Sequence, residues 1–335
     1  MSADEADWTR AVGLLTAYDE VALVCHVGPD GDALGSMLAL GIALRDRGTK
    51  VRASFGSEPF KVPVAYAGLP GLDLLVPADE IAEAPGLLVT FDTGSIDRLG
   101  SLGDRVAAAA DVLVIDHHVS NTRFGTVNLV DVHAAATAVV VVELLDRLGL
   151  PLTAEIAAPV YTGLVTDTGS FKYAATTPAV HQLAARLLAT GIRHDLISRD
   201  IWDTASFAYV QLLGAACARA VLEPAAVAGL GLVWTTVTEE DLSGAGLALS
   251  DVEGVIDVVR TAREAEVAAV MKRDPADGLL KVSTRSKGAV DVGAICGSLG
   301  GGGHRFAAGF TSSEDVDETL GKLRAALATA PHLPV

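Results

Sequence analysis

Short apolar runs alternate with helix-like stretches through the first half of the chain, and this alternation limits the folds that it can adopt. The runs are rich in β-branched residues and lie at 21–27, 51–55, 87–92 and 112–116. Continuously apolar runs are typical of strands that are covered on both faces. Strands that alternate with helices, such as the helix expected at 34–47, predict an α/β fold with a doubly wound, mainly parallel sheet.

The second half of the chain has a different pattern. Residues 134–220 are rich in Ala and Leu and mostly helical in their periodicity. Further elements are expected after Pro224: a strand at 230–237, a helix at 251–264 with Ser250 as its N-cap, a hairpin formed by 267–272 and 279–284, and an amphipathic helix at 316–328. These elements predict a smaller α/β domain at the C-terminal end.

The length of 335 residues is sufficient for two domains, each with its own core. We place the change of pattern in the helical region that ends near residue 225. The sequence therefore predicts a larger domain at 1–200, a helical linker at 201–225 and a smaller domain at 226–335.

Acidic and imidazole side chains gather where the predicted strands end. His26, Asp30 and Asp32 follow the first strand, Asp92 ends the third, Asp116, His117 and His118 close the fourth, and Asp167 lies further along. In an open parallel sheet the carboxyl ends of the strands form the ligand-binding edge, so the first three segments are expected to meet there. This convergence follows from the topology alone.

Carboxylates buried together repel one another unless cations neutralise them. A mixture of carboxylates and imidazoles suits divalent metals that accept oxygen and nitrogen ligands. One carboxylate at a strand end can bridge two ions roughly 3.5–4 Å apart, the spacing of two-metal hydrolases. The pattern therefore predicts a two-metal site that hydrolyses phosphate esters.

The charge of the chain is unevenly distributed. The formal net charge of −17 argues against a general nucleic-acid coat protein, which would be basic. Residues 260–310 nevertheless hold eight Lys and Arg against five acidic residues, a net charge of +3. This asymmetry favours an acidic half that holds cations and a basic half that holds anions. Aromatic residues make up only 5% of the chain, which argues against a long base-stacking track and hence against long nucleic acids as substrates.

Three features predict a cytoplasmic protein that does not enter a membrane. Cys25, Cys217 and Cys296 are scattered and odd in number, which does not suit a disulfide framework. The acidic N-terminal segment lacks the basic start and apolar middle of a secretory signal. The most apolar run, at 134–145, is too short to span a bilayer and contains Glu143.

The acidic and imidazole residues, taken in order, resemble the four motifs of the DHH phosphoesterases. That superfamily includes RecJ-type exonucleases, family-II inorganic pyrophosphatases, exopolyphosphatases and cyclic-dinucleotide phosphodiesterases. The segments 282–286, 290–292, 300–304 and 307–310 resemble the DHH-associated domain. The length and the pairing of domains most resemble the short oligoribonucleases, or nanoRNases, that also remove a phosphate from adenosine 3′,5′-bisphosphate (pAp).

The resemblance implies a role for each motif residue. One metal would be held by His26, Asp30 and Asp92, and the other by Asp32, Asp92, His117 and Asp167, so that Asp92 bridges the two. His118 would face the scissile phosphate, and Asp116 would support the histidine pair, which makes Asp92, Asp116 and His118 the catalytic candidates. The family usually works with manganese, and magnesium and cobalt also suit the ligand set.

The resemblance also points to a substrate-binding segment in the C-terminal domain, made of Arg285, Ser286, Gly302, Gly303, His304 and Arg305. A run of glycines permits close backbone approach and can expose N–H groups to an anion. Arg285 can bind a phosphate through two hydrogen bonds. We hypothesise that the N-terminal domain holds the metals and the scissile phosphate, while the C-terminal domain grips the terminal phosphate or nucleotide.

The leading interpretation is hydrolysis of RNAs of two to five nucleotides, of linear di-adenylate (pApA) and of pAp to mononucleotides. Cyclic di-AMP is a further candidate substrate, and the family resemblance implies a homodimer. The alternative enzyme is a family-II-type inorganic pyrophosphatase or exopolyphosphatase. A third interpretation, from another class, is a nucleotide-sensing module without turnover, against which the complete set of ligands argues.

Overall fold

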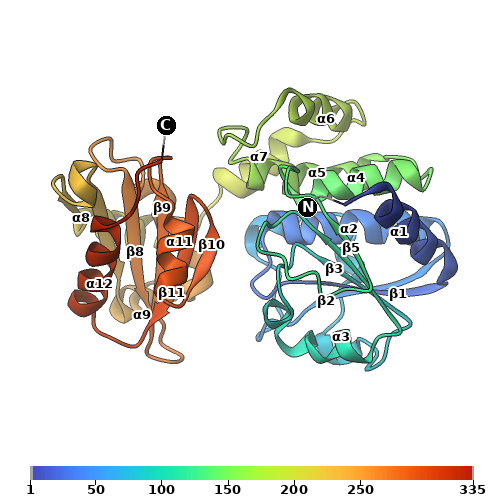
Figure 1. The fold of residues 1–335 in the computed structure, drawn as a ribbon, viewed down its shortest axis with the longest axis horizontal. Coiled ribbons are helices and arrows are strands. Elements are labelled where there is room, and N and C mark those ends of the chain that lie inside the picture. Colours follow the sequence, from blue (N-terminus) through green and yellow to red (C-terminus); the bar gives the residue numbers. More distant parts are fainter. Residues whose placement is uncertain (1–2, 334–335) are drawn as a thin grey trace. The chain divides into compact units, whose positions relative to one another are not determined.

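The computed structural model describes residues 3–333, and the chain divides into two compact units, Met1–Thr204 and Ala205–Val335 (Figure 1). Each unit has its own sheet and its own apolar core. No helix within residues 3–333 combines the length and the apolar character needed to cross a bilayer. The role of 201–225 as a linker stays a prediction; within it, Leu212 and Ala216 of helix α8 (Phe207–Ala218) are buried in a core of the second unit.

The first unit is built on a five-stranded, fully parallel sheet in the order β2-β1-β3-β4-β5. The strands are β1 (Glu20–Cys25), β2 (Lys50–Phe55), β3 (Leu87–Phe91), β4 (Asp111–Asp116) and β5 (Val127–Val130). The predicted parallel sheet and its first four strands are confirmed to within one or two residues. Strand β5 was not predicted, because it is only four residues long and its apolar run is interrupted by Asn128.

Helices cover both faces of this sheet. They are α1 (Glu5–Ala17), α2 (Gly31–Asp46), α3 (Asp104–Ala108), α4 (Thr137–Arg147), α5 (Ala154–Asp167), α6 (Pro178–Leu188) and α7 (His194–Trp202). Figure 1 shows α1, α2, α4 and α5 on one face and α3 on the other. The arrangement confirms the doubly wound α/β fold, and it explains why the strands are apolar without alternation.

Helix α2 packs against α5 with their backbones almost in contact. A Cβ atom added at Gly35 would lie 2.3 Å from the carbonyl oxygen of Pro159, and one added at Gly31 would lie 2.6 Å from Cγ2 of Thr166. Glycine is therefore required along the face of α2 that meets α5. This close approach brings the C-terminal end of α5 to the N-terminal end of α2, where the predicted site begins.

The second unit contains a six-stranded mixed sheet in the order β10-β11-β9-β8-β7-β6. Its strands are β6 (Val221–Glu223), β7 (Leu232–Val237), β8 (Val267–Arg273), β9 (Leu280–Ser286), β10 (Gly302–His304) and β11 (Ala307–Ser312). Its helices are α8 (Phe207–Ala218), α9 (Glu239–Ala245), α10 (Val255–Val259), α11 (Val292–Ser298) and α12 (Val316–Ala328). The predicted strand, hairpin and final helix, and the smaller α/β domain that they form, are confirmed.

The predicted helix at 251–264 is wrong in its extent. The segment forms a short 3₁₀ turn, Leu249–Val252, followed by the five-residue helix α10, with Gly254 between them. Ser250 is not the N-cap; instead the Asp251 carboxylate accepts a hydrogen bond from the N–H of Ala248 at 2.8 Å. The glycine and the competing local hydrogen bond break the helix that the apolar spacing predicts.

We expect Gly35→Ala to lower the free energy of unfolding by about 1–3 kcal/mol, because the added methyl group must push α2 and α5 apart. Urea denaturation measures this change. Gly13→Ala is the matched control: Gly13 also lies in a helix, but nothing is within 4 Å of its added Cβ, so stability should rise by up to about 1 kcal/mol. Equal effects at the two positions would contradict the close α2–α5 contact.

Candidate metal centre

The predicted metal ligands lie at the carboxyl edge of the parallel sheet in the first unit. Cys25 of β1 pairs with Phe91 of β3, and Phe91 pairs with Ile115 of β4. The residues that follow these three, namely His26, Asp92 and Asp116, are therefore level with one another on neighbouring strands. The structure thus brings together the three segments that the strand pattern places at this edge.

Asp92 lies at the centre of the cluster and has an unusual backbone. Its φ angle is +52°, in the left-handed region that Asp and Asn tolerate better than most residues. Its N–H donates to the carbonyl oxygen of Ile115 at 3.0 Å, which anchors it to β4. The side chain is only 4% exposed. A strained backbone at a buried carboxylate is typical of a functional position.

One group of donor atoms is formed by His26, Asp30 and Asp92, whose ligand atoms lie within 4.8 Å of one another. Nε2 of His26 lies 3.5 Å from Oδ2 of Asp92 and 3.7 Å from Oδ2 of Asp30. Nδ1 of His26 lies 2.9 Å from the carbonyl oxygen of Val27. An N–H at Nδ1 would donate to this carbonyl and leave the Nε2 lone pair facing the carboxylates.

A second group is formed by Asp32, Asp92 and His117, again with ligand atoms within 4.8 Å. Nε2 of His117 lies 3.6 Å from Oδ1 of Asp92 and 3.1 Å from Oδ2 of Asp167. Its Nδ1 lies 3.1 Å from the carbonyl oxygen of Ala134, so both histidines use a backbone carbonyl in the same way. Asp167 reaches this group because it is the last residue of α5.

Asp116 and His118 form a separate arrangement beside Asp92. Oδ1 of Asp116 lies 2.7 Å from Nδ1 of His118 and accepts hydrogen bonds from the N–H groups of His117 and His118. Oδ2 of Asp116 accepts a hydrogen bond from the side-chain amide of Asn121 at 2.5 Å. Both oxygens of this fully buried carboxylate are therefore occupied by protein groups. The geometry favours a supporting role for Asp116.

The carboxylates have strongly divergent pKa values in the metal-free protein. Burial, with the charges of Asp167 and Asp92, raises the pKa of Asp32 well above its ordinary value. Burial likewise raises the pKa of Asp167 to about 6, against the opposing hydrogen bond from His117. Burial also acts on Asp92, but there His26 and the other histidines outweigh it and lower the pKa.

The histidines balance this negative charge. Burial opposes protonation of His26, but its interactions with Asp30 and Asp92 prevail and raise its pKa to about 10. At His117 burial is likewise outweighed, by Asp167 and Asp92, and the pKa lies well above its ordinary value. Protons on imidazoles thus neutralise the cluster when no cation is bound.

These donor sets fit two divalent ions. Each group supplies one imidazole nitrogen and carboxylate oxygens, and the buried Asp92 belongs to both groups. Its two oxygens face different histidines, Oδ2 towards His26 and Oδ1 towards His117. A carboxylate shared in this way suits a pair of metal ions.

The side chains of Thr137, Asn121 and Tyr66 lie in or beside the cluster and were not predicted. The Thr137 hydroxyl donates to Oδ1 of Asp92 at 2.9 Å, and Asn121 donates to Asp116 as described above. Tyr66 is hydrogen-bonded to the backbone of Gly31 beside Asp30, and burial together with that carboxylate raises its pKa. Only Asn121 follows a motif closely enough in sequence to have been suspected; Thr137 lies in a run that was interpreted only as helix.

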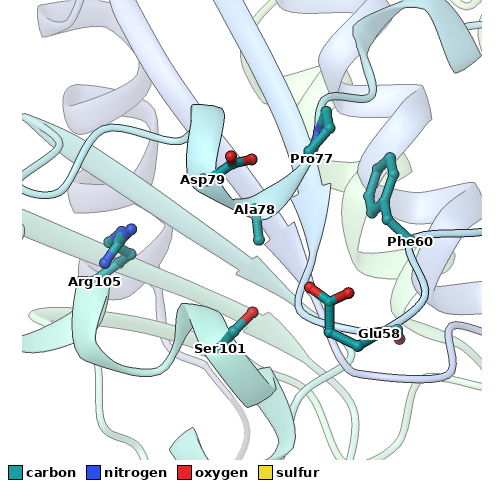
Figure 2. A pocket seen from close by; sticks show the side chains of 8 residues that line it. Glu58, Phe60, Pro77, Ala78, Asp79, Ser101 and Arg105 are labelled. Atoms are coloured by element: carbon teal, nitrogen blue, oxygen red, sulfur yellow. The ribbon is translucent and has the colours of Figure 1, made fainter.

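The first unit has a hollow at its surface, and none of the predicted metal ligands line it. It has a volume of about 400 Å³, and Figure 2 shows Glu58, Asp79 and Arg105 around it, with Phe60 at one side. Its lining residue Ser57 accepts a hydrogen bond from the N–H of Gly28, in the loop that carries His26 and Asp30. The hollow is thus linked to that loop through a single hydrogen bond.

The predicted substrate-binding residues all lie in the second unit, on β9, β10 and the turns beside them. Arg285 projects from β9, with Nε 4.0 Å from Oδ1 of Asp257, and Nε of Arg305 lies 3.8 Å from Oδ2 of Asp291. Ser286 is buried; its hydroxyl donates to Glu266 and accepts from the N–H of Gly288. These hydrogen bonds stabilise the turn that follows β9. A contact between Ser286 and a substrate stays a prediction.

The glycine-rich segment is a short edge strand, β10, rather than an open loop. Gly302 pairs with Gly309 and His304 with Ala307 of β11. At Gly303, φ is +140° and an added Cβ would lie 2.6 Å from Cα of Ala308. Close packing against β11 therefore explains this glycine, and an additional contact with an anion stays a prediction for Gly302, Gly303 and His304.

Comparison with known proteins agrees with this arrangement. The model of the DHH family N-terminal domain matches residues 20–164, and that of the DHHA1 domain matches residues 234–330. The bifunctional oligoribonuclease and PAP phosphatase NrnA of Thermus thermophilus is 38% identical, over 87% of this chain and 83% of that relative. The cyclic-di-AMP phosphodiesterase GdpP of Geobacillus thermodenitrificans is 28% identical over 95% of this chain, which covers 48% of its length.

Solved structures show the same fold. An exopolyphosphatase-related protein from Bacteroides fragilis has a TM-score of 0.86 at 22% identity, with 97% of this chain and 96% of that chain covered. RecJ from Thermus thermophilus, solved in complex with Mn²⁺, has a TM-score of 0.57 at 16% identity, with 97% of this chain and 55% of that chain covered. The level of identity to NrnA over most of both chains, together with the two domain matches, shows that this chain belongs to the DHH phosphoesterase family.

Proposed function

We propose that the protein is a two-metal phosphoesterase that hydrolyses short oligoribonucleotides to mononucleotides and removes the 3′-phosphate of pAp. The observation that carries the proposal is the position of Asp92, whose two carboxylate oxygens face His26 and His117 in two separate donor groups. The relatives named for oligoribonuclease and PAP phosphatase activity support the substrate class.

The proposed ligands are His26, Asp30 and Asp92 for one ion and Asp32, Asp92, His117 and Asp167 for the other. Manganese is the first choice of ion, with magnesium and cobalt as alternatives. When bound, such ions lower the pKa of a water molecule and neutralise charge on a phosphoryl group. Burial, with the charges of neighbouring carboxylates, raises the pKa values of Asp32 and Asp167, so a bound cation would favour their charged forms.

His118 is the proposed contact with the scissile phosphate. Nδ1 of its ring lies 2.7 Å from Asp116, and Nε2 is the atom proposed to orient the phosphate or to give a proton to the leaving oxygen. Burial opposes protonation of His118, but Asp116 and Asp92 raise its pKa, so that the ring holds a proton more readily. Asp116 keeps the ring in one orientation because its own oxygens are fixed by backbone N–H groups and by Asn121.

Arg285, His304 and Arg305 are the proposed phosphate-binding residues of the second unit. Cyclic di-AMP is an additional proposed substrate, supported by the similarity to GdpP. A homodimer and a cytoplasmic location also stay proposals, the first resting on the family and the second on the scattered cysteines. No observation favours the pyrophosphatase alternative or a module without turnover.

The central test is turnover by metal-stripped protein that is supplied again with Mn²⁺. We expect release of AMP from pApA, a five-nucleotide RNA and pAp. Asp92→Asn should reduce each rate by at least about 10²-fold, because Asn tolerates the left-handed backbone but cannot neutralise two cations. Hydrolysis of pyrophosphate alone would contradict the proposed class of nucleotide substrates. Absence of any turnover would contradict the proposal that the protein is an enzyme.

The two neighbouring histidines are expected to differ in what they do. His117→Asn should weaken Mn²⁺ binding, because an imidazole ligand is lost. His118→Asn should leave Mn²⁺ affinity within about threefold of the original while kcat falls by roughly 10²–10⁴-fold, the range of a lost general acid. Titration of Mn²⁺ and steady-state kinetics on pAp measure both quantities. A His118 variant that loses its metal would show that the roles are assigned wrongly.

The thermal stability of the metal-stripped protein should fall as the pH rises from about 6.5 to 10. The folded-state pKa of His26, about 10, lies above its ordinary value of 6.5, so its stabilising charge is complete below pH 6.5 and is lost as the pH passes the folded value. A midpoint of unfolding that drops by several degrees in this window, and drops less in His26→Gln, is the expected result. With Mn²⁺ bound the decline should disappear, because the metal replaces the proton.

A further inference from the structure

Thr137 is the first residue of α4, and it contacts two of the proposed metal ligands. Its hydroxyl donates a hydrogen bond to Oδ1 of Asp92 at 2.9 Å. Its backbone N–H donates to Oδ2 of Asp32 at 2.5 Å, and the N–H of Ala138 donates to Oδ1 of Asp32 at 2.9 Å. Thr137, Asp32 and Asp92 are all buried.

Helix α4 has no cap from its own sequence. Its N-cap residue is Ala136, whose side chain cannot accept a hydrogen bond. The carboxylate of Asp32, from α2, satisfies the first two N–H groups of α4 instead. This arrangement fixes both oxygens of Asp32 while each still has a lone pair to offer.

Asp32 is fully buried, and the backbone of α5 lies close to its carboxylate. On the side of α5, a Cβ atom added at Gly163 would lie 2.6 Å from Oδ1 of Asp32 and 3.0 Å from Cβ of Ala138. The carboxylate is thus enclosed between the N-terminal end of α4 and the backbone of α5. The contacts of α4 therefore determine where this ligand lies.

The Thr137 hydroxyl acts on Asp92 in a different way. A carboxylate rotates easily about its Cβ–Cγ bond, because that torsion has broad minima. Asp92 must nevertheless keep Oδ2 towards His26 and Oδ1 towards His117 to serve both groups. The hydrogen bond from Thr137 to Oδ1 opposes this rotation. Thr137 is fully buried, and its hydroxyl makes this hydrogen bond in the protein without any bound ligand.

We propose that Thr137 is a positioning residue of the metal centre, which sets the rotation of the bridging carboxylate of Asp92 and, through its backbone, the position of Asp32. The proposal rests on the proposed function, because it assumes that these carboxylates bind metal. Groups that orient metal ligands in this way commonly affect metal affinity by about 10–100-fold.

The test compares Thr137→Val, which removes the hydroxyl with little change of shape, with Thr137→Ser, which keeps it. Thr90→Val is the matched control. Thr90 lies two residues before Asp92 on β3 and is fully buried, and within residues 3–333 its hydroxyl has no hydrogen-bond partner. Mn²⁺ is titrated into each metal-stripped protein, and the thermal midpoint of the metal-free protein and the turnover of pAp are measured alongside.

We expect Thr137→Val to weaken Mn²⁺ binding by about 10–100-fold, Thr137→Ser to restore it to within about threefold, and Thr90→Val to leave it unchanged. A purely structural role for the hydroxyl would lower the metal-free midpoint of Thr137→Val and leave its Mn²⁺ affinity unchanged. If Thr137→Val does not fold, Thr137→Ala takes its place.

The outcomes of these experiments distinguish the positioning role of Thr137 from the proposed function. If Thr137→Val binds Mn²⁺ as tightly as the original protein, the positioning role is overturned while the proposed function stands. If the original protein binds Mn²⁺ and the Thr137 series behaves as expected but no substrate is hydrolysed, the proposed function fails and the positioning role stands. Absence of Mn²⁺ binding by the original protein would overturn both.

Discussion

The mutual repulsion of buried carboxylates is the constraint on which the rest of this structure depends. Asp32, Asp92 and Asp116 are all nearly inaccessible to solvent, and Asp167 lies beside them. Each has a different compensation: N–H groups of α4 for Asp32, histidines for Asp92, and backbone N–H groups with Asn121 for Asp116. The sheet, the glycine-lined α2–α5 contact and the loops after β3 and β4 all serve to keep these charges together at a largely buried edge of the sheet.

Different groups compensate the negative charge of each buried carboxylate, and these differences separate the proposed roles of the carboxylates. Both Asp32 and Asp116 accept hydrogen bonds on each oxygen, but Oδ1 of Asp116 also lies 2.7 Å from Nδ1 of His118, so Asp116 acts on that ring. Asp92 faces two imidazoles whose protons a metal ion can replace. Burial, with the charges of neighbouring carboxylates, raises the pKa values of Asp32 and Asp167, so both carboxylates gain from a bound cation.

The sequence was sufficient to predict the parallel sheet and which segments meet at its edge, because both follow from local patterns. Apolar runs that end in His26, Asp92 and Asp116 specify the strands and the edge together. Thr137 could not be predicted, since its partners are distant in sequence and its own surroundings are those of an ordinary apolar helix. The prediction of a helix at 251–264 was wrong for the opposite reason. Its apolar spacing is helical, but Gly254 and the local hydrogen bond of Asp251 interrupt the helix.

The capping of α4 by Asp32 also has a consequence for the order in which the chain folds. The two partners are 105 residues apart, so the first turn of α4 is satisfied only after a long loop has closed. A nascent chain that ends before residue 137 lacks both the cap of Asp32 and the ligand Asp167. The complete ligand set therefore requires the chain as far as the end of α5.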